Sequence, residues 1–149
     1  MPNNDTEAPA DSVFDWPVRI YYEDTDAGGV VYHANYITYM ERARTEYLRD
    51  LGVEQDTLSL EHGIIFAVRS VEVQYLVPAR FNDLLRVTVS RPVGRGASVS
   101  FFQTVCRGDD ILVAAKVRVV SLDPVSLRPR RLPAFLLTAL PLTESTIGQ

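Results

Sequence analysis

The sequence predicts an α+β fold, in which an antiparallel sheet of about five strands wraps one long helix. Two observations indicate this class. The first half of the chain carries one long stretch with helical spacing of apolar residues, and the segments after residue 62 alternate as strands do. The turns between those segments are short, whereas parallel pairing needs long crossovers, so we expect an antiparallel sheet.

The size and composition fit one folded domain. The chain has 149 residues, of which 46% are hydrophobic and 23% charged, an ordinary globular balance with enough residues for a core. We predict a disordered tail over 1–12, a single domain over 13–141 and a C-terminal tail over 142–149. The net charge of −4 argues against nucleic-acid binding.

Several signals for other cellular locations are missing from the sequence. The first twelve residues lack the basic and apolar regions of a signal peptide, and no apolar run approaches the roughly 18 residues of a membrane span. Cys106 is the only cysteine, which excludes an intramolecular disulfide, and we expect it to be buried. The expected location is the cytoplasm.

The first half is expected to hold a strand over 17–23, a loop over 24–34 and a helix over 35–51. The strand places alternate apolar side chains on one face, whereas the helix repeats them every three or four positions. Asn35 is expected to cap the helix N-terminus, and Gly52 to end the helix.

The second half is expected to be rich in strands, over 64–77, 84–91, 97–106 and 111–122. The apolar phase changes near Arg69, which indicates a bulge or a change of covered face. The turns PVGRG and RGDD are short enough for hairpins. A last helix is expected over 133–140, with a proline in its first turn.

The loop before the long helix, within YYEDTDAGGVVYHANY (21–36), concentrates chemically active residues. Asp24, Asp26 and Gly29 match three positions of an EF-hand calcium loop, but Asn35 stands where a bidentate Glu is needed. A transition-metal site of Asp24, Asp26 and His33 is short of ligands, and the Lys of a phosphate-binding P-loop is missing. We therefore expect no metal site.

Two interpretations of this loop remain. It can be a tight turn, in which Asp24 and Asp26 cap backbone amides and glycine supplies a positive φ. A turn, however, does not need three neighbouring acids that repel one another. A carboxylate held beside a helix N-terminus can act as a base or nucleophile next to electrophilic N–H groups.

Three segments resemble a known family: YYEDTDAGGVVYHANYITYMERARTEYLRDLG (21–52), VEVQYLVPARFNDLL (71–85) and LDPVSLRPRRLP (122–133). They are similar to the 4-hydroxybenzoyl-CoA-type thioesterases and, within these, to the acyl-CoA thioesterases associated with the Tol–Pal cell-envelope system. The resemblance implies the hotdog fold, a curled antiparallel sheet around one long helix. It also implies homodimers joined at sheet edges, or homotetramers, with active sites between subunits.

The resemblance assigns the catalytic carboxylate to Asp26 and the backbone N–H that polarises the thioester carbonyl to His33. Substrate contacts are expected from residues of the loop and helix start and from two arginines suited to the CoA phosphates: Tyr22, Gly29, Tyr32, Tyr36, Arg95 and Arg128. Arg44 lies inside the apolar stripe of the helix, so we expect it to pair with a carboxylate, from Glu41 or across the dimer.

The expected function is hydrolysis of an acyl-CoA thioester to a free carboxylic acid and CoA, with Asp26 as nucleophile or general base. No cofactor is expected, since CoA is part of the substrate. The alternative is a non-catalytic module that binds acyl-CoA or acyl carrier protein in the cell-envelope system. A dehydratase or hydratase of the same fold ranks lower, because those enzymes arrange an Asp/His pair differently.

Overall fold

The computed structural model describes residues 12–141 and 143–144. Its helices are α1 (His33–Asp50), α2 (Gln55–His62) and α3 (Ala134–Ala139), and a 3₁₀ turn, η1, spans Tyr22–Asp24. Its strands are β1 (Ser12–Arg19), β2 (Ile65–Tyr75), β3 (Leu84–Ser90), β4 (Val93–Arg95), β5 (Ser98–Arg107), β6 (Asp110–Leu122) and β7 (Thr143–Glu144). Most of the two predicted tails lies outside the described residues.

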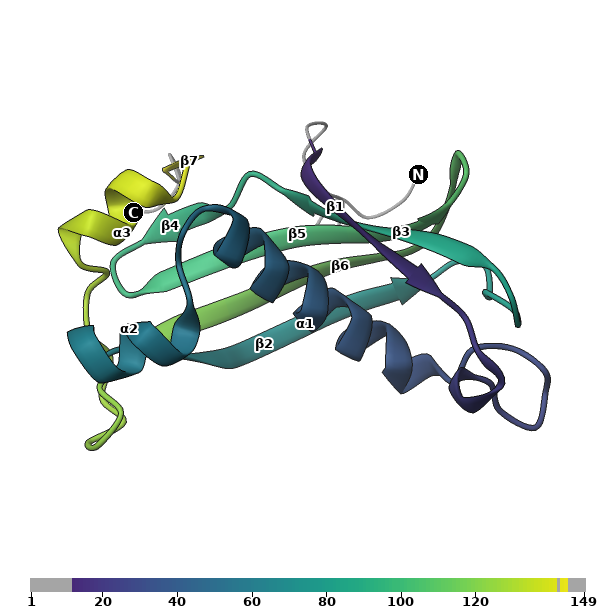
Figure 1. Cartoon of the computed structure of the whole chain (residues 1–149), viewed down its shortest axis with the longest axis horizontal. Coiled ribbons are helices and arrows are strands. Elements are labelled where there is room, and N and C mark those ends of the chain that lie inside the picture. The colour runs from purple at the N-terminus through teal and green to yellow at the C-terminus, as the bar shows by residue number, and fades with distance from the viewer. Residues whose placement is uncertain (1–11, 142, 145–149) are drawn as a thin grey trace.

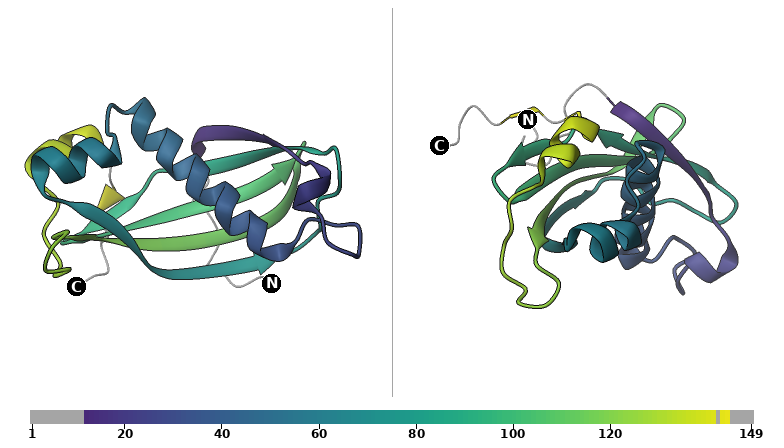
Figure 2. Two further views of the ribbon diagram at one scale, coloured as in Figure 1. Left: turned by 60° about the horizontal axis from the view of Figure 1, so that its bottom comes forward. Right: turned by 60° about the vertical axis from the view of Figure 1, so that its left-hand side comes forward.

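The five long strands form one antiparallel sheet in the order β1–β3–β5–β6–β2. The short β4 also pairs with β5, and β7 runs parallel to β4. The sheet curls around α1, which crosses one of its faces diagonally (Figures 1 and 2). The predicted α+β class, with a curled antiparallel sheet around one long helix, is confirmed.

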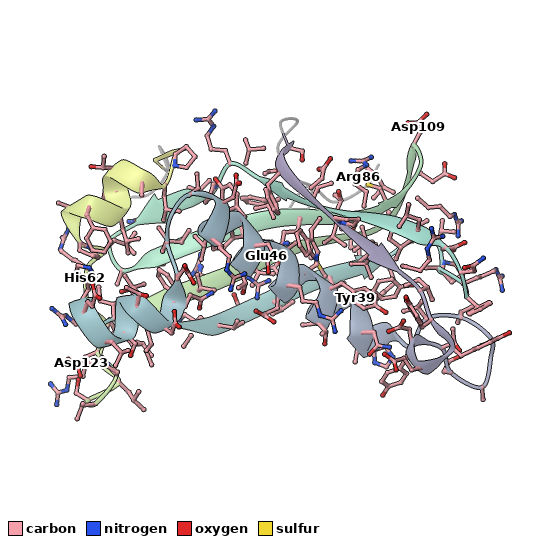
Figure 3. The ribbon with its side chains drawn as sticks, in the orientation of Figure 1. Tyr39, Glu46, His62, Arg86, Asp109 and Asp123 are labelled. Carbon is pink, nitrogen blue, oxygen red and sulfur yellow. The ribbon has the colours of Figure 1, made fainter. Side chains whose placement is uncertain are left out.

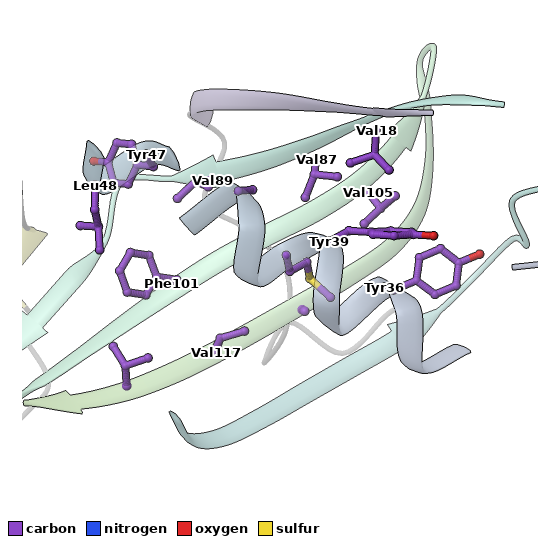
Figure 4. Packing of buried hydrophobic residues seen from close by; sticks show 14 of the residues in the cluster. Val18, Tyr36, Tyr39, Tyr47, Leu48, Val87, Val89, Phe101, Val105 and Val117 are labelled. Carbon is purple, nitrogen blue, oxygen red and sulfur yellow. The ribbon is translucent and has the colours of Figure 1, made fainter. Parts of the chain in front are cut away.

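The core lies between α1 and this face of the sheet (Figure 4). The predicted apolar stripe of α1 is buried, with Tyr36, Met40, Ala43 and Tyr47 no more than 3% exposed. Burying one large apolar side chain contributes about 1.5–3 kcal/mol, so this stripe fixes α1 against the strands. Among the described helices, none is both long and apolar enough to cross a membrane.

Two local predictions in the sheet are confirmed. The register between β2 and β6 shifts between Val68 and Ser70, which places a bulge at Arg69. The RGDD turn closes the β5–β6 hairpin, with Gly108 at φ +59°. The PVGRG segment (92–96) also belongs to a hairpin, but its Val93–Arg95 form the strand β4, which pairs with β5.

The first strand differs from its prediction over 17–23. β1 ends at Arg19, and Tyr22 lies in the 3₁₀ turn with 74% of its surface exposed. The carboxylate of Asp24 accepts a hydrogen bond of 2.7 Å from the N–H of Tyr21, which favours the turn over further strand. Pro17 is tolerated inside β1 because β1 pairs with β3 alone among the described strands.

The helix boundaries also correct the predictions. The long helix begins at His33 after Tyr32 as N-cap, so the prediction that Asn35 caps it is wrong. Gly52, at φ +86°, follows its end as expected. The helix α2 was not predicted, because Leu58 is its one buried residue and a single apolar contact leaves no periodic pattern.

Candidate functional site

The loop of acids and glycines is a tight turn built around Asp26. The N–H of Asp26 donates to the carbonyl of Val30 at 2.9 Å, and the N–H of Gly29 donates back to the carbonyl of Asp26 at 3.0 Å. Gly29 has φ +80°, a conformation that glycine adopts without strain. The predicted positive-φ glycine is therefore present, and the side chain of Asp26 stands on a closed, hydrogen-bonded turn.

The carboxylate of Asp26 is held by the same turn. Its Oδ1 accepts a hydrogen bond of 2.8 Å from the N–H of Gly28. A Cβ added at Gly28 would lie 3.3 Å from this oxygen, so only a residue without a side chain leaves the carboxylate undisturbed. Asp26 itself is exposed, and its second oxygen accepts no hydrogen bond within the described chain, which leaves it available to a substrate or water.

Asp24, two residues earlier, ties this turn to the start of α1. Its carbonyl accepts hydrogen bonds from the N–H of Tyr32 at 3.0 Å and from Nδ2 of Asn35 at 2.9 Å. Its carboxylate accepts from the N–H of Tyr21. Asp24 therefore has a structural role, and the side chain of Asn35 connects α1 to the loop.

The N-terminus of α1 offers free N–H groups beside this loop. No side chain caps it, and the N–H groups of His33 and Ala34 donate to no acceptor within the described residues. Such groups carry the positive end of the helix dipole and stabilise negative charge on a ligand oxygen. The arrangement suits a carbonyl that becomes an oxyanion during reaction.

A groove of about 200 Å³ opens next to these N–H groups, lined by Val31, His33, Tyr36, Tyr75, Leu76, Val77 and Pro78. The imidazole of His33 is exposed and lies between the rings of Tyr32 and Tyr75, with centroids 4.7 and 6.1 Å away. The hydroxyl of Tyr75 donates to the carbonyl of His33 at 3.2 Å. The groove is thus mostly apolar, with its polar groups at the helix start.

Three tyrosines near the helix start stay protonated at neutral pH. Burial raises the pKa of Tyr36 and of Tyr75, and burial together with the neighbouring Asp24 carboxylate raises the pKa of Tyr39. The hydroxyl of Tyr36 is also fixed, since it accepts the N–H of Ala79 at 2.9 Å. These hydroxyls can take part in hydrogen bonds, but they are poorly suited to act as bases.

The other predicted substrate residues fall into two groups. Gly29, Tyr32 and Tyr36 lie in the loop or at the helix start with Asp26 and His33, and Tyr22 stacks on Phe81 with ring centroids 3.8 Å apart. Arg95 ends β4 and Arg128 follows β6, and both segments lie at the opposite end of the sheet from the loop (Figure 1). Within one chain, these arginines and Asp26 are not brought together.

Figure 3 shows the side chains at the two ends of the molecule. Tyr39 stands in the half of α1 nearest the acid–glycine loop (residues 24–32), whereas His62 and Asp123 mark the far end. In the described part of the chain, no three His, Cys, Asp or Glu side chains gather to hold a metal ion.

Some residues of the site were not predicted. Tyr75 and Pro78 line the groove, and Phe81 carries the ring of Tyr22. They lie at the end of β2 and in the loop after it. The alternating apolar pattern there predicts a strand, but it does not predict which parts of the fold lie beside that strand. The one available signal was Pro78, which cannot donate to a strand ladder and so indicates where β2 ends.

Comparison with known proteins gives a consistent family. The profile of the Thioesterase-like superfamily matches residues 21–140. The chain is 46% identical over 123 residues to the acyl-CoA thioester hydrolase YbgC of Escherichia coli O157:H7, covering 82% of this chain and 91% of that protein. It is 45% identical over 123 residues to the acyl-CoA thioesterase YbgC of Haemophilus influenzae, covering 83% and 90%.

Solved structures share the fold. The crystal structure of a probable thioesterase from Bartonella henselae is 37% identical, with a TM-score of 0.76, and the match covers 80% of this chain and 98% of that one. The family profile thus spans the loop, α1 and the strands β2 to β6.

Proposed function

Because the chain belongs to the thioesterase-like superfamily, we propose that it is an acyl-CoA thioesterase, which hydrolyses an acyl-CoA thioester to a carboxylic acid and CoA. The observation that carries this proposal is the joining of Asp26 and the uncapped N-terminus of α1 in one hydrogen-bonded unit. The relatives named above support the substrate class.

In the proposed reaction, the N–H of His33 donates to the thioester carbonyl oxygen and stabilises the negative charge that develops there. One such donor typically contributes on the order of 10² to 10³ in rate. The C–S bond then breaks, CoA leaves as the thiolate, and water supplies the second oxygen of the acid. The imidazole of His33 is not needed for this role, since the donor is backbone.

Asp26 can serve in two ways. Its carboxylate attacks the carbonyl carbon and forms an anhydride that water hydrolyses, or it removes a proton from a water that attacks. Single-turnover hydrolysis in isotopically labelled water, followed by mass spectrometry of the protein, tests the first route. Label incorporated into Asp26 requires the anhydride.

We propose that the acyl group enters the apolar groove beside Tyr36, with Tyr32 and Gly29 at its mouth and Tyr22 at the neighbouring surface. His33 lines the groove, so a thioester bound there would present its carbonyl to the helix start. No metal ion or redox cofactor enters the proposed reaction.

We propose a homodimer, in which β2 of one subunit pairs antiparallel with β2 of the other, or a tetramer of two such dimers. Among the described strands, β2 pairs with β6 alone, so its outer edge is available. Twofold pairing would bring the far end of one subunit toward the acid–glycine loop of its neighbour. Arg128 follows β6 next to β2, so it is better placed for CoA phosphates there than Arg95.

The cellular setting is also a proposal. We propose a cytoplasmic enzyme with acyl-CoA as substrate and acyl carrier protein as a second partner, and the resemblance to thioesterases of the Tol–Pal system supports this. Acyl-carrier-protein thioesters tested beside acyl-CoA thioesters would establish which carrier the site accepts.

The central test is release of free thiol from a panel of short, long and aromatic acyl-CoAs. Wild-type protein should hydrolyse at least one of them, and Asp26→Asn should lower kcat by about 10² to 10⁴. Asn keeps the size of the side chain, so folding, followed by circular dichroism, should be unchanged. Turnover by Asp26→Asn equal to that of the wild type would contradict the catalytic role of Asp26. Tight binding of acyl-CoA by the wild type without any turnover would favour the non-catalytic binding module.

A further inference from the structure

The loop after β2, residues 78–83, holds the segment that carries the proposed catalytic carboxylate. On one side of that segment, the N–H of Ile20 donates to the carbonyl of Asp83 at 2.9 Å. On the other side, the N–H of Val31 donates to the carbonyl of Ala79, also at 2.9 Å. The chain between Ile20 and Val31 is thus fixed at both ends to one loop, which we call the support loop.

The support loop also contacts the turn and the helix on either side of the acid–glycine loop. The N–H of the fully buried Ala79 donates to the hydroxyl of Tyr36 in α1 at 2.9 Å. The ring of Phe81 stacks on that of Tyr22 in η1, with centroids 3.8 Å apart and planes 5° from parallel. The helix start and the 3₁₀ turn therefore rest on the same loop.

A single carboxylate anchors the support loop to the sheet. Oδ2 of Asp83 accepts the N–H of Arg80 at 2.9 Å and Nη1 of Arg107, the last residue of β5, at 2.7 Å. The same nitrogen of Arg107 donates to the carbonyl of Pro78 at 3.5 Å, so the ion pair ties both ends of the support loop to β5. The side chains of Asp83 and Arg107 are 22% and 34% exposed, so water screens this pair less than a fully exposed one.

The turn inside the support loop needs such an anchor. It contains Asn82 at φ +73°, a left-handed conformation that costs free energy for a residue with a Cβ and that surrounding contacts must maintain. The N–H of Asp83 closes the turn onto the carbonyl of Arg80 at 3.1 Å, and Nη1 of Arg19 donates to the carbonyl of Asn82 at 2.8 Å. Removing the ion pair would leave the turn with fewer of the contacts that keep its shape.

We propose that Asp83 and Arg107 are positioning residues of the hydrolysis, which set the distance between Asp26 and the N–H of His33 through the support loop. Neither Asp83 nor Arg107 lines the apolar groove, so they act through the backbone and not on the substrate. The positioning role rests on the proposed function, whereas the anchoring of the acid–glycine loop by this ion pair does not.

Amide hydrogen exchange tests the anchoring without substrate. Asp83→Asn keeps an acceptor for the N–H of Arg80 but removes the charge that pairs with Arg107. The amides of Ile20 and Val31 should then exchange about tenfold faster or more, because the support loop that accepts their hydrogen bonds opens more often. Amides in the middle of β6 should exchange as they do in the wild type.

Steady-state kinetics test the positioning role. Asp83→Asn and Arg107→Met should each lower kcat for the preferred acyl-CoA by about 10- to 100-fold and leave KM nearly unchanged, because a misplacement of about 1 Å can cost on the order of 10² in rate. The double variant should be no slower than the slower single variant, since both changes remove the same link. Arg107→Lys should recover most of the rate, because a single nitrogen of Arg107 makes both contacts.

The ion pair of Arg86 with Asp15 offers the matched control. It joins β3 to β1 at 3.8 Å, and Arg86 also donates to the carbonyl of Gly108, so this pair lies outside the support loop. Arg86→Met should leave kcat and the exchange of the Val31 amide unchanged. A loss of kcat as large as that of Arg107→Met would show that losing any ion pair of the sheet suffices, and would overturn the positioning role.

The two measurements separate the anchoring from the proposed function. Unchanged exchange of Ile20 and Val31 in Asp83→Asn, or faster exchange throughout the sheet in step with global unfolding, would overturn the anchoring. Faster exchange at these two amides with an unchanged kcat would overturn the positioning role. If the wild type releases no thiol from any acyl-CoA, the proposed function fails, and the exchange measurement decides the anchoring by itself.

Discussion

Asp24 and Asp26 are the same residue type two positions apart, and their surroundings give them different roles. Asp24 directs its carbonyl to Tyr32 and Asn35 and its carboxylate to the N–H of Tyr21. Asp26 makes one side-chain hydrogen bond, to Gly28, and is otherwise exposed. The difference lies in which backbone donors the turn brings near each carboxylate. Hydrogen bonding thus separates an anchor, Asp24, from Asp26, the carboxylate proposed to react.

Asn35 gives a residue-scale prediction. Asn35→Ala removes the hydrogen bond between α1 and the carbonyl of Asp24, so the distance between Asp26 and the His33 N–H is less well fixed. A misplacement of about 1 Å can cost on the order of 10² in rate, so we expect kcat to fall about 10- to 100-fold with little change in KM. Steady-state kinetics on the preferred acyl-CoA measure this.

Thr38→Ala, on the exposed face of the same helix, is the matched control and should leave kcat unchanged. Each variant needs a thermal melt beside its kinetics. If the activity of Asn35→Ala falls only in proportion to the fraction of protein that is unfolded, and kcat of the folded protein is unchanged, a positioning role is contradicted.

Among the elements, the acid–glycine loop depends on two glycines for different reasons. Gly29 has a positive φ and open space where a Cβ would lie, whereas at Gly28 a Cβ would crowd the carboxylate of Asp26. Gly29 thus serves the backbone conformation, and Gly28 leaves room for the carboxylate proposed to react. Their adjacency in the sequence conceals this division.

Two alanine substitutions should separate these roles. Gly29→Ala should lower the free energy of unfolding by about 1–2 kcal/mol, the cost of a left-handed conformation with a Cβ. Gly28→Ala should lower kcat and leave the free energy of unfolding nearly unchanged, because its Cβ displaces the carboxylate of Asp26. Urea unfolding and thiol-release kinetics on both variants measure this. If the loss of kcat relative to the loss of unfolding free energy is the same in both variants, the distinction is refuted.

The helix α1 carries Tyr47, whose buried hydroxyl finds no hydrogen-bond partner within the described residues. Burial raises the pKa of Tyr47, so the folded state holds this proton more tightly than the unfolded state. Its contribution to stability is therefore complete below the ordinary tyrosine pKa of about 10 and falls as the pH rises above it.

Tyr47→Phe should leave stability at pH 7 unchanged or raise it by up to about 1 kcal/mol, because it removes a buried polar group without a partner. It should also flatten the fall of stability between pH 9 and pH 11, a range around the ordinary tyrosine pKa of about 10. Urea unfolding at several pH values tests both effects. A clear loss of stability at pH 7 would show that the hydroxyl has a partner.

The long elements were predictable from the sequence because each repeats a signal. The apolar stripe from Tyr36 to Tyr47 predicted α1, and the change of phase at Arg69 predicted the bulge. The turn at Tyr22 was not predicted, because the strand-like alternation of this segment is overridden by the hydrogen bond that the N–H of Tyr21 donates to the carboxylate of Asp24. Local polar contacts of this kind leave no periodic trace.

The site shows the same limit. The acids, glycines and His33 are contiguous in the sequence, so they could be identified together. Tyr75 and Phe81 come from a distant segment, and no local pattern indicates that β2 ends beside the helix start. The expected ion pair between Arg44 and Glu41 does not form within the described residues, where Glu41 accepts the hydroxyl of Thr45 and Arg44 donates to Gln103. A pair across the dimer stays a prediction.

At the scale of the whole molecule, the sheet has a long outer strand on each side. On one side lies β1, and on the other β2, with Val68, Val71 and Tyr75 all at least 37% exposed. A single chain keeps its acid–glycine loop and its Arg95 and Arg128 at opposite ends (Figure 1). If both groups act on one substrate, they must come from two chains.

This separation gives a prediction for the proposed dimer. Arg128→Ala should raise KM for an acyl-CoA by about tenfold or more and leave kcat nearly unchanged, because a hydrogen bond to a charged group contributes about 1.5–3 kcal/mol and 1.4 kcal/mol is a factor of about ten. Arg95→Ala, the matched control farther from β2, should have a smaller effect. An acyl-N-acetylcysteamine thioester, which lacks the nucleotide, should give the same KM with wild type and both variants.

Light scattering on each variant should give the same mass as the wild type. A larger effect of Arg95→Ala than of Arg128→Ala, or an equal effect on the truncated thioester, would contradict the placement of the phosphates.

Pro17 in β1 has a consequence for how copies of this chain add to one another. Proline has no N–H, so β1 offers an interrupted row of donors on its outer side, whereas the outer edge of β2 contains no proline. The outer edge of β2 is thus better suited than that of β1 to extend the sheet. In the proposed dimer, two copies that meet there would use up each other's free edge, so extension of the sheet would stop at a closed pair and would not continue into a fibre.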